Sequence, residues 1–135
     1  NPKTQAVLAL GPDSAPPAMR AVEKLGLKGK MYFASFDLSE EIAKGIKDGS
    51  IQFAIDQQPY LQGYIPVAVL AIMKQDKTTD LAKVREKLIN NAKFKARLAE
   101  YGLAPSYGPR HIGSGPGYVT KDNIGKVEKY AGQFR

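Results

Sequence analysis

Hydrophobic residues occur along this chain as short continuous runs that alternate with helical stripes. The runs are apolar almost throughout, and they cover residues 4–10, 30–36 and 51–55. Runs of this length predict strands, and the lack of polar alternation is typical of strands covered on both faces. A segment with apolar residues at helical spacing follows each run, in turn between Ser14 and Gly26, between Ser39 and Gly49, and from Tyr60 to about Met73.

This order of elements predicts an α/β fold with a parallel sheet. Two strands joined by a helix pair in parallel, because the helix carries the chain back to the end of the sheet at which the first strand began. Such crossovers are almost always right-handed. We therefore expect a Rossmann-like sheet in which strands near 5–10, 31–36 and 51–56 lie side by side, with helices on both faces.

Local signals place the helix ends. Ser14 and Ser39 stand where an N-cap is expected, and Gly26 and Gly49 stand where the first two helices should stop. The helix from Tyr60 is apolar almost all round, which predicts burial. Three further helices are expected, at residues 80–90, 92–101 and 123–131.

The composition narrows the possible functions. With 135 residues, 43% hydrophobic and 24% charged, the chain is large enough for one domain with a modest core. It has no cysteine, which excludes disulfides, thiolate metal sites and a cysteine nucleophile. The formal net charge is +7, but the cations of residues 74–97 alternate with apolar residues at helical spacing. That pattern indicates solvated helix faces, so we expect no nucleic-acid partner.

Polar side chains follow each of the first three strands. Pro12 and Asp13 come after the first, Asp37 comes directly after Phe36, and the third ends in Asp56, Gln57 and Gln58. Ligands of open parallel α/β sheets bind beyond the carboxyl ends of the strands. A carboxylate, an amide and an aromatic ring together suit a polyhydroxylated ligand such as a sugar or polyol, because they bond its hydroxyls and stack on its C–H face.

Each of these residues also has a purely structural alternative. Asp37 alone could cap the helix that follows it. Asp13 could be a turn residue, and the side chains of Gln57 and Gln58 could bond the neighbouring backbone. Their common position at one edge of one sheet favours the ligand-binding interpretation.

Nothing in the sequence supports catalysis. His111 is the only histidine, and no nucleophile motif lies near it. The glycines of residues 113–117 lack the spacing of a dinucleotide site, and no phosphate loop or metal motif is present. The sequence therefore predicts a binding protein with no catalytic residue, no metal and no cofactor.

Three stretches carry a resemblance to a known family. They are "FDLS" at residues 36–39, "GSIQFAIDQQPYLQGY" at residues 49–64 and "SGPGYVTKDN" at residues 114–123. Together they resemble the C-terminal lobe of type I periplasmic sugar-binding proteins, the solute receptors of ribose-type ABC importers. The resemblance covers nearly the whole chain, and the middle stretch is the most specific.

The resemblance implies two Rossmann-like lobes joined by a hinge, with a sugar bound in the cleft. Asp37 and Gln57 match the family's sugar-binding positions, and Phe36 matches a position that often carries an aromatic ring. The remaining implied ligand-binding residues are Pro12, Asp13 and Gln58. Asp56 and Gly115 fall on implied hinge segments.

The resemblance also implies a division of the chain. Residues 1–58 form the core of the sugar-binding lobe, residues 59–113 belong to the other lobe, and residues 114–135 return through the hinge to a terminal helix. The start at Asn1, without Met or a signal peptide, is expected of the inside of a longer protein.

The implied partners are a missing N-terminal lobe, the permease subunits of an ABC transporter and a sugar or polyol, in the periplasm. The alternative is the effector-binding domain of a LacI-type transcription regulator, which shares the fold. A signal peptide upstream of this segment would indicate the receptor, and a helix-turn-helix would indicate the regulator.

Overall fold

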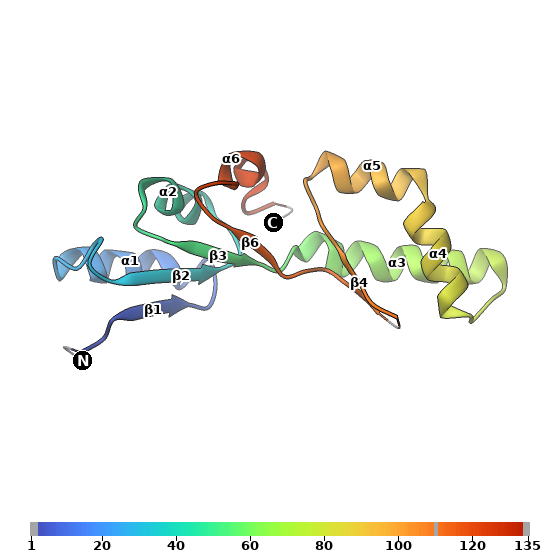
Figure 1. Cartoon of the computed structure of the whole chain (residues 1–135), viewed down its shortest axis with the longest axis horizontal. Helices are drawn as coiled ribbons and strands as arrows, with labels where there is room; N and C mark the ends of the chain where they lie inside the picture. The colour runs from blue at the N-terminus through green and yellow to red at the C-terminus, as the bar shows by residue number, and fades with distance from the viewer. Residues whose placement is uncertain (1–2, 110, 134–135) are drawn as a thin grey trace. The chain divides into compact units, whose positions relative to one another are not determined.

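The computed structural model describes residues 3–109 and 111–133, which divide into two compact units. Unit 1 contains residues 3–57 and 117–133, and unit 2 contains residues 58–116 without residue 110. The chain leaves unit 1 after Gln57 and re-enters it at Gly117 (Figure 1). Unit 1 therefore carries most of the strand ends that the sequence singled out.

Unit 1 is built on a four-stranded sheet. Its strands are β1 (Ala6–Ala9), β2 (Tyr32–Phe36), β3 (Phe53–Asp56) and β6 (Gly117–Val119), in the order β1-β2-β3-β6. β1, β2 and β3 are parallel, as the alternating pattern predicted. β6 runs antiparallel to β3 and pairs Gly117 with Asp56.

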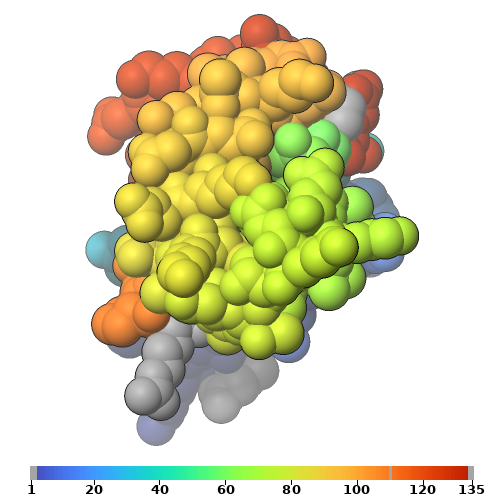
Figure 2. Space-filling view, turned by 90° about the vertical axis from the view of Figure 1, so that its right-hand side faces the viewer, coloured from blue at the N-terminus to red at the C-terminus, as the bar shows by residue number. Residues whose placement is uncertain are grey.

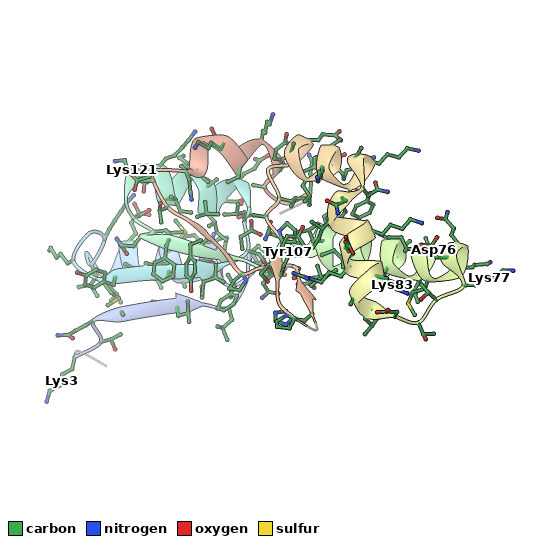
Figure 3. All side chains as sticks on the ribbon, turned by 45° about the vertical axis from the view of Figure 1, so that its right-hand side comes forward. Lys3, Asp76, Lys77, Lys83, Tyr107 and Lys121 are labelled. Carbon is green, nitrogen blue, oxygen red and sulfur yellow. The ribbon has the colours of Figure 1, made fainter. Side chains whose placement is uncertain are left out.

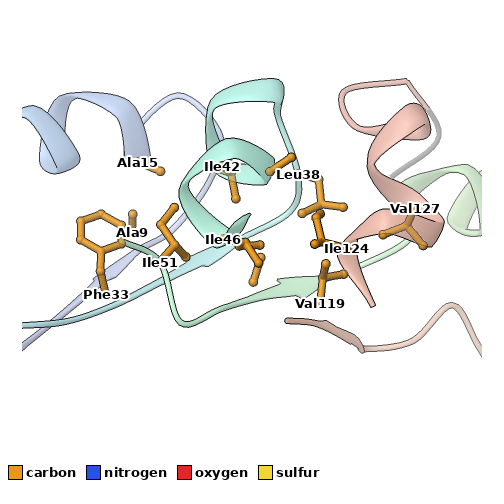
Figure 4. Close-up of a cluster of buried hydrophobic side chains, with 12 residues drawn as sticks. Ala9, Ala15, Phe33, Leu38, Ile42, Ile46, Ile51, Val119, Ile124 and Val127 are labelled. Carbon is orange, nitrogen blue, oxygen red and sulfur yellow. The ribbon is translucent and has the colours of Figure 1, made fainter. Parts of the chain in front are cut away.

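The helices of unit 1 lie on one face of this sheet (Figure 4). They are α1 (Ala15–Lys24), α2 (Glu40–Asp48) and α6 (Ile124–Val127), and a 3₁₀ turn, η1 (Glu128–Tyr130), follows α6. Phe33 and Val119 from the strands pack against Ile42 and Ile46 of α2 in a core that also includes Ile124. The α/β fold class is thus confirmed.

The other face of the sheet is open within the described part of unit 1. Side chains alternate along a strand, so the neighbours of the core-facing residues point to this second face. Leu8, Tyr32 and Tyr118 are 51%, 72% and 62% exposed there, and Phe53 packs against Tyr118 with ring centroids 6.3 Å apart. The helices that were expected on both faces cover only one face in the described residues.

The helix ends follow the sequence signals except at Ser14, where the position is right but the side chain does not cap. The Ser39 hydroxyl accepts a hydrogen bond from the Ile42 amide at 3.2 Å, and Gly49 ends α2 with a φ of +81°. Ser14 occupies the N-cap position of α1 as expected, but its side chain does not cap the helix: its hydroxyl donates to the Gly11 carbonyl at 3.1 Å. Ser14 has helical angles, whereas a capping side chain needs extended backbone.

Unit 2 consists of three helices and a short hairpin. The helices are α3 (Pro59–Asp76), α4 (Leu81–Asn90) and α5 (Ala92–Glu100), and the hairpin pairs β4 (Ser106–Tyr107) with β5 (Ile112–Gly113). Figure 2 shows the surfaces of α3 and α4 side by side. At the far end of α3, the Lys87 ammonium contacts the Asp76 carboxylate at 2.5 Å (Figure 3, where Asp76 is labelled).

The expectation that α3 is buried all round is only partly correct. Leu61, Ile65 and Ile72 are buried in the core of unit 2, but Val67 and Leu70 are 67% and 64% exposed. The reason is that the other elements of unit 2 cover one side of the helix. No helix in the described ranges is long and apolar enough to cross a membrane.

Close packing of α2 gives a first testable expectation. A Cβ atom at Gly45 would lie 2.9 Å from the side chains of Ile51 and Met19, whereas one at Gly125 would meet nothing within 4 Å. We expect Gly45→Val to lower the free energy of unfolding by about 1–3 kcal/mol, because added volume strains a packed core. Urea denaturation followed by circular dichroism measures this. Gly125→Val is the matched control, and equal losses from both variants would contradict the packing argument.

Candidate functional site

Asp37 and Gln57 lie together at the carboxyl edge of the unit 1 sheet. The Asp37 amide donates to the Ile55 carbonyl at 2.7 Å, which extends the pairing of β2 with β3 by one residue. The Oδ1 atom of the Asp37 carboxylate accepts a hydrogen bond from the backbone amide of Gln57 at 3.0 Å. These two bonds hold Asp37, at the end of β2, beside Gln57, at the end of β3.

The backbone of Asp37 holds the carboxylate in this position. Its φ of +55° lies in the left-handed region, which Asp tolerates better than most residues. The turn leads into Leu38, which is buried, and then into Ser39, which caps α2. The alternative that Asp37 is the cap is therefore wrong. Asp37 is half-buried, and its Oδ2 has no hydrogen-bond partner among the described residues.

The neighbouring strand ends add further groups to the same edge. Gln57 is exposed, and Phe36 is half-buried directly before Asp37. After β1 the chain turns at Gly11, whose carbonyl accepts from the amides of Ser14 and Ala15 at 3.2 and 3.1 Å. This turn leaves Asp13 exposed and Pro12 half-buried next to the end of β2.

Gln58 has a different role from its neighbour. Its side chain is fully buried in unit 2, where its Nε2 donates to the carbonyls of Ala104 at 3.0 Å and Ser114 at 2.5 Å. Its Oε1 accepts from the Ala104 amide at 2.7 Å. The structural alternative, in which this amide bonds the backbone, fits Gln58. Gln58 thus supports the fold of unit 2, unlike the exposed Gln57.

The two residues assigned to hinge segments lie close to the places where the chain passes between the units. Asp56 is fully buried at the end of β3, one residue before Gln57. The Gly115 carbonyl accepts from the Ser106 hydroxyl at 3.4 Å, two residues before Gly117. Their role in a hinge stays a prediction.

Unit 2 adds an aromatic cluster that the sequence did not reveal. Tyr60 stacks on Tyr64 with ring centroids 5.4 Å apart and meets Tyr101 edge-on at 5.3 Å. The Arg97 guanidinium donates to the Tyr101 hydroxyl at 2.9 Å. Burial raises the pKa of Tyr60, and the charge of Arg97 partly offsets this. The four-residue spacing of Tyr60 and Tyr64 is the signal that could have placed both rings on one face of α3, whereas no local pattern points to Tyr101.

Other chemistry has little support in the described residues. No cluster of three or more histidines, aspartates and glutamates placed to hold a metal ion occurs among them. His111 is exposed on the hairpin of unit 2, and its ring packs against Gly108. The arrangement at the sheet edge offers one oriented carboxylate and one amide side chain, which are groups that bind hydroxyls.

Residues 1–78 match the model of a family described as "Periplasmic binding protein domain". The chain belongs to this family. The match begins before β1 and ends just after α3, so it includes Asp13, Asp37 and Gln57 of this periplasmic binding protein domain. The resemblance to periplasmic binding proteins that the sequence motifs carry is thereby confirmed.

Solved structures are similar to this periplasmic binding protein domain. A carbohydrate transporter from Acidothermus cellulolyticus 11B, in complex with myo-inositol, is 27% identical and superposes with a TM-score of 0.66 over 97% of this chain and 36% of its own. A carbohydrate transporter solute binding protein from Agrobacterium radiobacter, in complex with D-arabinose, is 23% identical, with a TM-score of 0.54 over 96% of this chain and 35% of its own. A search of curated proteins found no match.

The chain thus spans only about a third of the length of the structures it matches, 36% and 35%. The second structure, at its lower identity, supports the fold alone.

Proposed function

We propose that this chain forms part of the sugar- or polyol-binding site of the solute-binding component of an ABC importer. The observation that carries the proposal is the hydrogen bond from the Gln57 backbone amide to the Asp37 carboxylate. This bond holds two residues whose side chains can bind hydroxyls side by side at the carboxyl edge of the parallel strands. Asp37 accepts hydrogen bonds from ring hydroxyls through its second oxygen. The Gln57 side chain binds a neighbouring hydroxyl, because adjacent strands are only about 4.8 Å apart.

Phe36, Pro12 and Asp13 complete this part of the site. Phe36 provides an apolar surface for the C–H groups of the sugar, and Asp13 is a second acceptor at the end of β1. The remaining walls come from a part of the receptor that this chain does not include, since it spans 36% of the related transporter.

Two observations support a transport receptor over the effector-binding domain of a regulator. The family model is that of a periplasmic binding protein domain, and the 27% identical structure is a carbohydrate transporter with bound myo-inositol. The receptor would work in the periplasm and deliver its ligand to the permease subunits of the importer. Myo-inositol is the first ligand to test.

Isothermal titration calorimetry of the complete receptor tests the proposal. We expect saturable one-to-one binding of at least one of myo-inositol, D-ribose and D-glucose. Cyclohexanol is the control, because it has the size of a sugar ring but only one hydroxyl, and it should give no heat of binding. The proposal would be wrong if none of the hydroxylated ligands binds to correctly folded protein.

A further inference from the structure

Unit 2 contains a cavity of about 170 Å³ that is separate from the proposed sugar site. Ile65 and Val69 of α3, Val84 of α4 and Ile112 of the hairpin form its apolar walls. The remaining lining includes Arg85 of α4 and His111 of the hairpin. All of these residues belong to unit 2, so the cavity lies within one compact unit.

Arg85 is the charged group among the described residues of this lining. Its Nε is buried and has no hydrogen-bond partner among the described residues. A buried donor without a partner is unfavourable, so a ligand that draws the guanidinium toward the cavity and accepts from it would gain free energy. The Arg85 guanidinium carbon also lies 6.0 Å from the centre of the Tyr107 ring, a distance at which the ring attracts and helps to hold the cation.

The shape and polarity of the cavity define a ligand class. An apolar cavity of roughly 150 Å³ is large enough for benzene. Among the described lining residues Arg85 is the cation, and a carboxylate matches its guanidinium best because it accepts two parallel hydrogen bonds. We propose that this cavity is a second ligand site, which takes a small carboxylate with one apolar ring or branched chain, with the carboxylate on Arg85.

The hairpin wall of the cavity depends on Gly108. A Cβ atom there would overlap the imidazole of His111, so a larger residue at position 108 would displace this ring. The Gly108 amide donates to the His111 carbonyl at 3.0 Å, which closes the turn. Glycine at this position allows the hairpin to close beside α4.

Benzoate is the probe for the test, and benzyl alcohol is its neutral counterpart. Chemical-shift changes of the backbone amides in ¹H–¹⁵N spectra of the 135-residue chain report both binding and its location. We expect shifts that saturate at residues lining the cavity, and an affinity for benzoate at least about tenfold higher than for benzyl alcohol, since hydrogen bonds to charged groups are the stronger ones.

Two variants with the same loss of charge separate this site from general attraction of anions. Arg85→Leu should reduce benzoate affinity about tenfold or more and leave benzyl alcohol binding within about twofold. Lys83→Leu removes a cation from the same helix, at a side chain that is 77% exposed and outside the cavity lining, and should change neither affinity. Lys83 is labelled on α4 in Figure 3.

Three results would overturn the proposal. The first is equal affinity of the parent chain for benzoate and benzyl alcohol, and this comparison holds even if Arg85→Leu does not fold. The second is an equal loss of benzoate affinity in Lys83→Leu. The third is a set of benzoate shifts that lie outside unit 2.

Discussion

Replacing Asp37 by alanine should weaken sugar binding by the complete receptor about tenfold to a hundredfold. Hydrogen bonds to an ionised group contribute about 1.5–3 kcal/mol, and each decade of affinity corresponds to about 1.4 kcal/mol. Gln57→Ala removes a neutral amide, whose hydrogen bonds contribute about 1 kcal/mol, so its loss should be only several-fold. Titration calorimetry with the receptor's best ligand measures both changes.

The control variant for Asp37→Ala has to tolerate the left-handed backbone conformation of residue 37. Alanine is strained at a φ of +55°, whereas asparagine tolerates this conformation and keeps one oxygen acceptor. Asp37→Asn should therefore preserve folding and lose an intermediate amount of affinity. Circular dichroism confirms that each variant is folded. If Asp37→Ala binds the sugar as tightly as the parent, the assignment of the site to Asp37 is wrong.

Replacing Gln58 by alanine should destabilise unit 2 by about 1.5 kcal/mol or more. The change removes a fully buried side chain that bonds the Ala104 amide and the carbonyls of Ala104 and Ser114. Each of these three hydrogen bonds contributes about 0.5–1.5 kcal/mol net. Backbone strain does not contribute, because glutamine and alanine are equally unfavourable at the φ of +52° found here.

Hydrogen exchange of the Ala104 amide reports this effect directly. Its exchange rate should rise at least about tenfold in Gln58→Ala, since about 1.4 kcal/mol corresponds to a factor of ten. Gln52→Ala is the matched control. Gln52 also bonds two backbone groups, those of Phe33 and Gly49, but it lies in unit 1, so its loss should leave exchange at Ala104 unchanged. Unchanged exchange at Ala104 in Gln58→Ala would contradict the structural role of this side chain.

The parallel sheet was predictable because the sequence signals for each strand and helix lie within or next to that element. Each strand is a short apolar run with a break after it, and the Ser39 cap and the Gly49 stop lie within a few residues of the helix they define. The same locality makes the strand ends easy to find. Asp37 and Gln57 could therefore be placed at one edge before any coordinates were known.

Other features depended on distant parts of the chain. Gln58 has the same local sequence context as Gln57, and only its partners Ala104 and Ser114 show that it supports the fold. One face of α3 is exposed because the other elements of unit 2 cover only its opposite side. The composition of the helix alone does not indicate which side they cover. The cavity at Arg85 is likewise lined by α3, α4 and the hairpin, which are separate in the sequence, so no local pattern predicts it.

A crystal structure of the complete receptor with myo-inositol tests the central claim most directly. The account predicts a ring hydroxyl that donates to Asp37 at an O···O distance of about 2.5–2.7 Å, as is usual for hydroxyl–carboxylate bonds. The Gln57 side chain should bond the same ring at a neighbouring hydroxyl. A bound ligand whose hydroxyls contact neither Asp37 nor Gln57 would contradict the account.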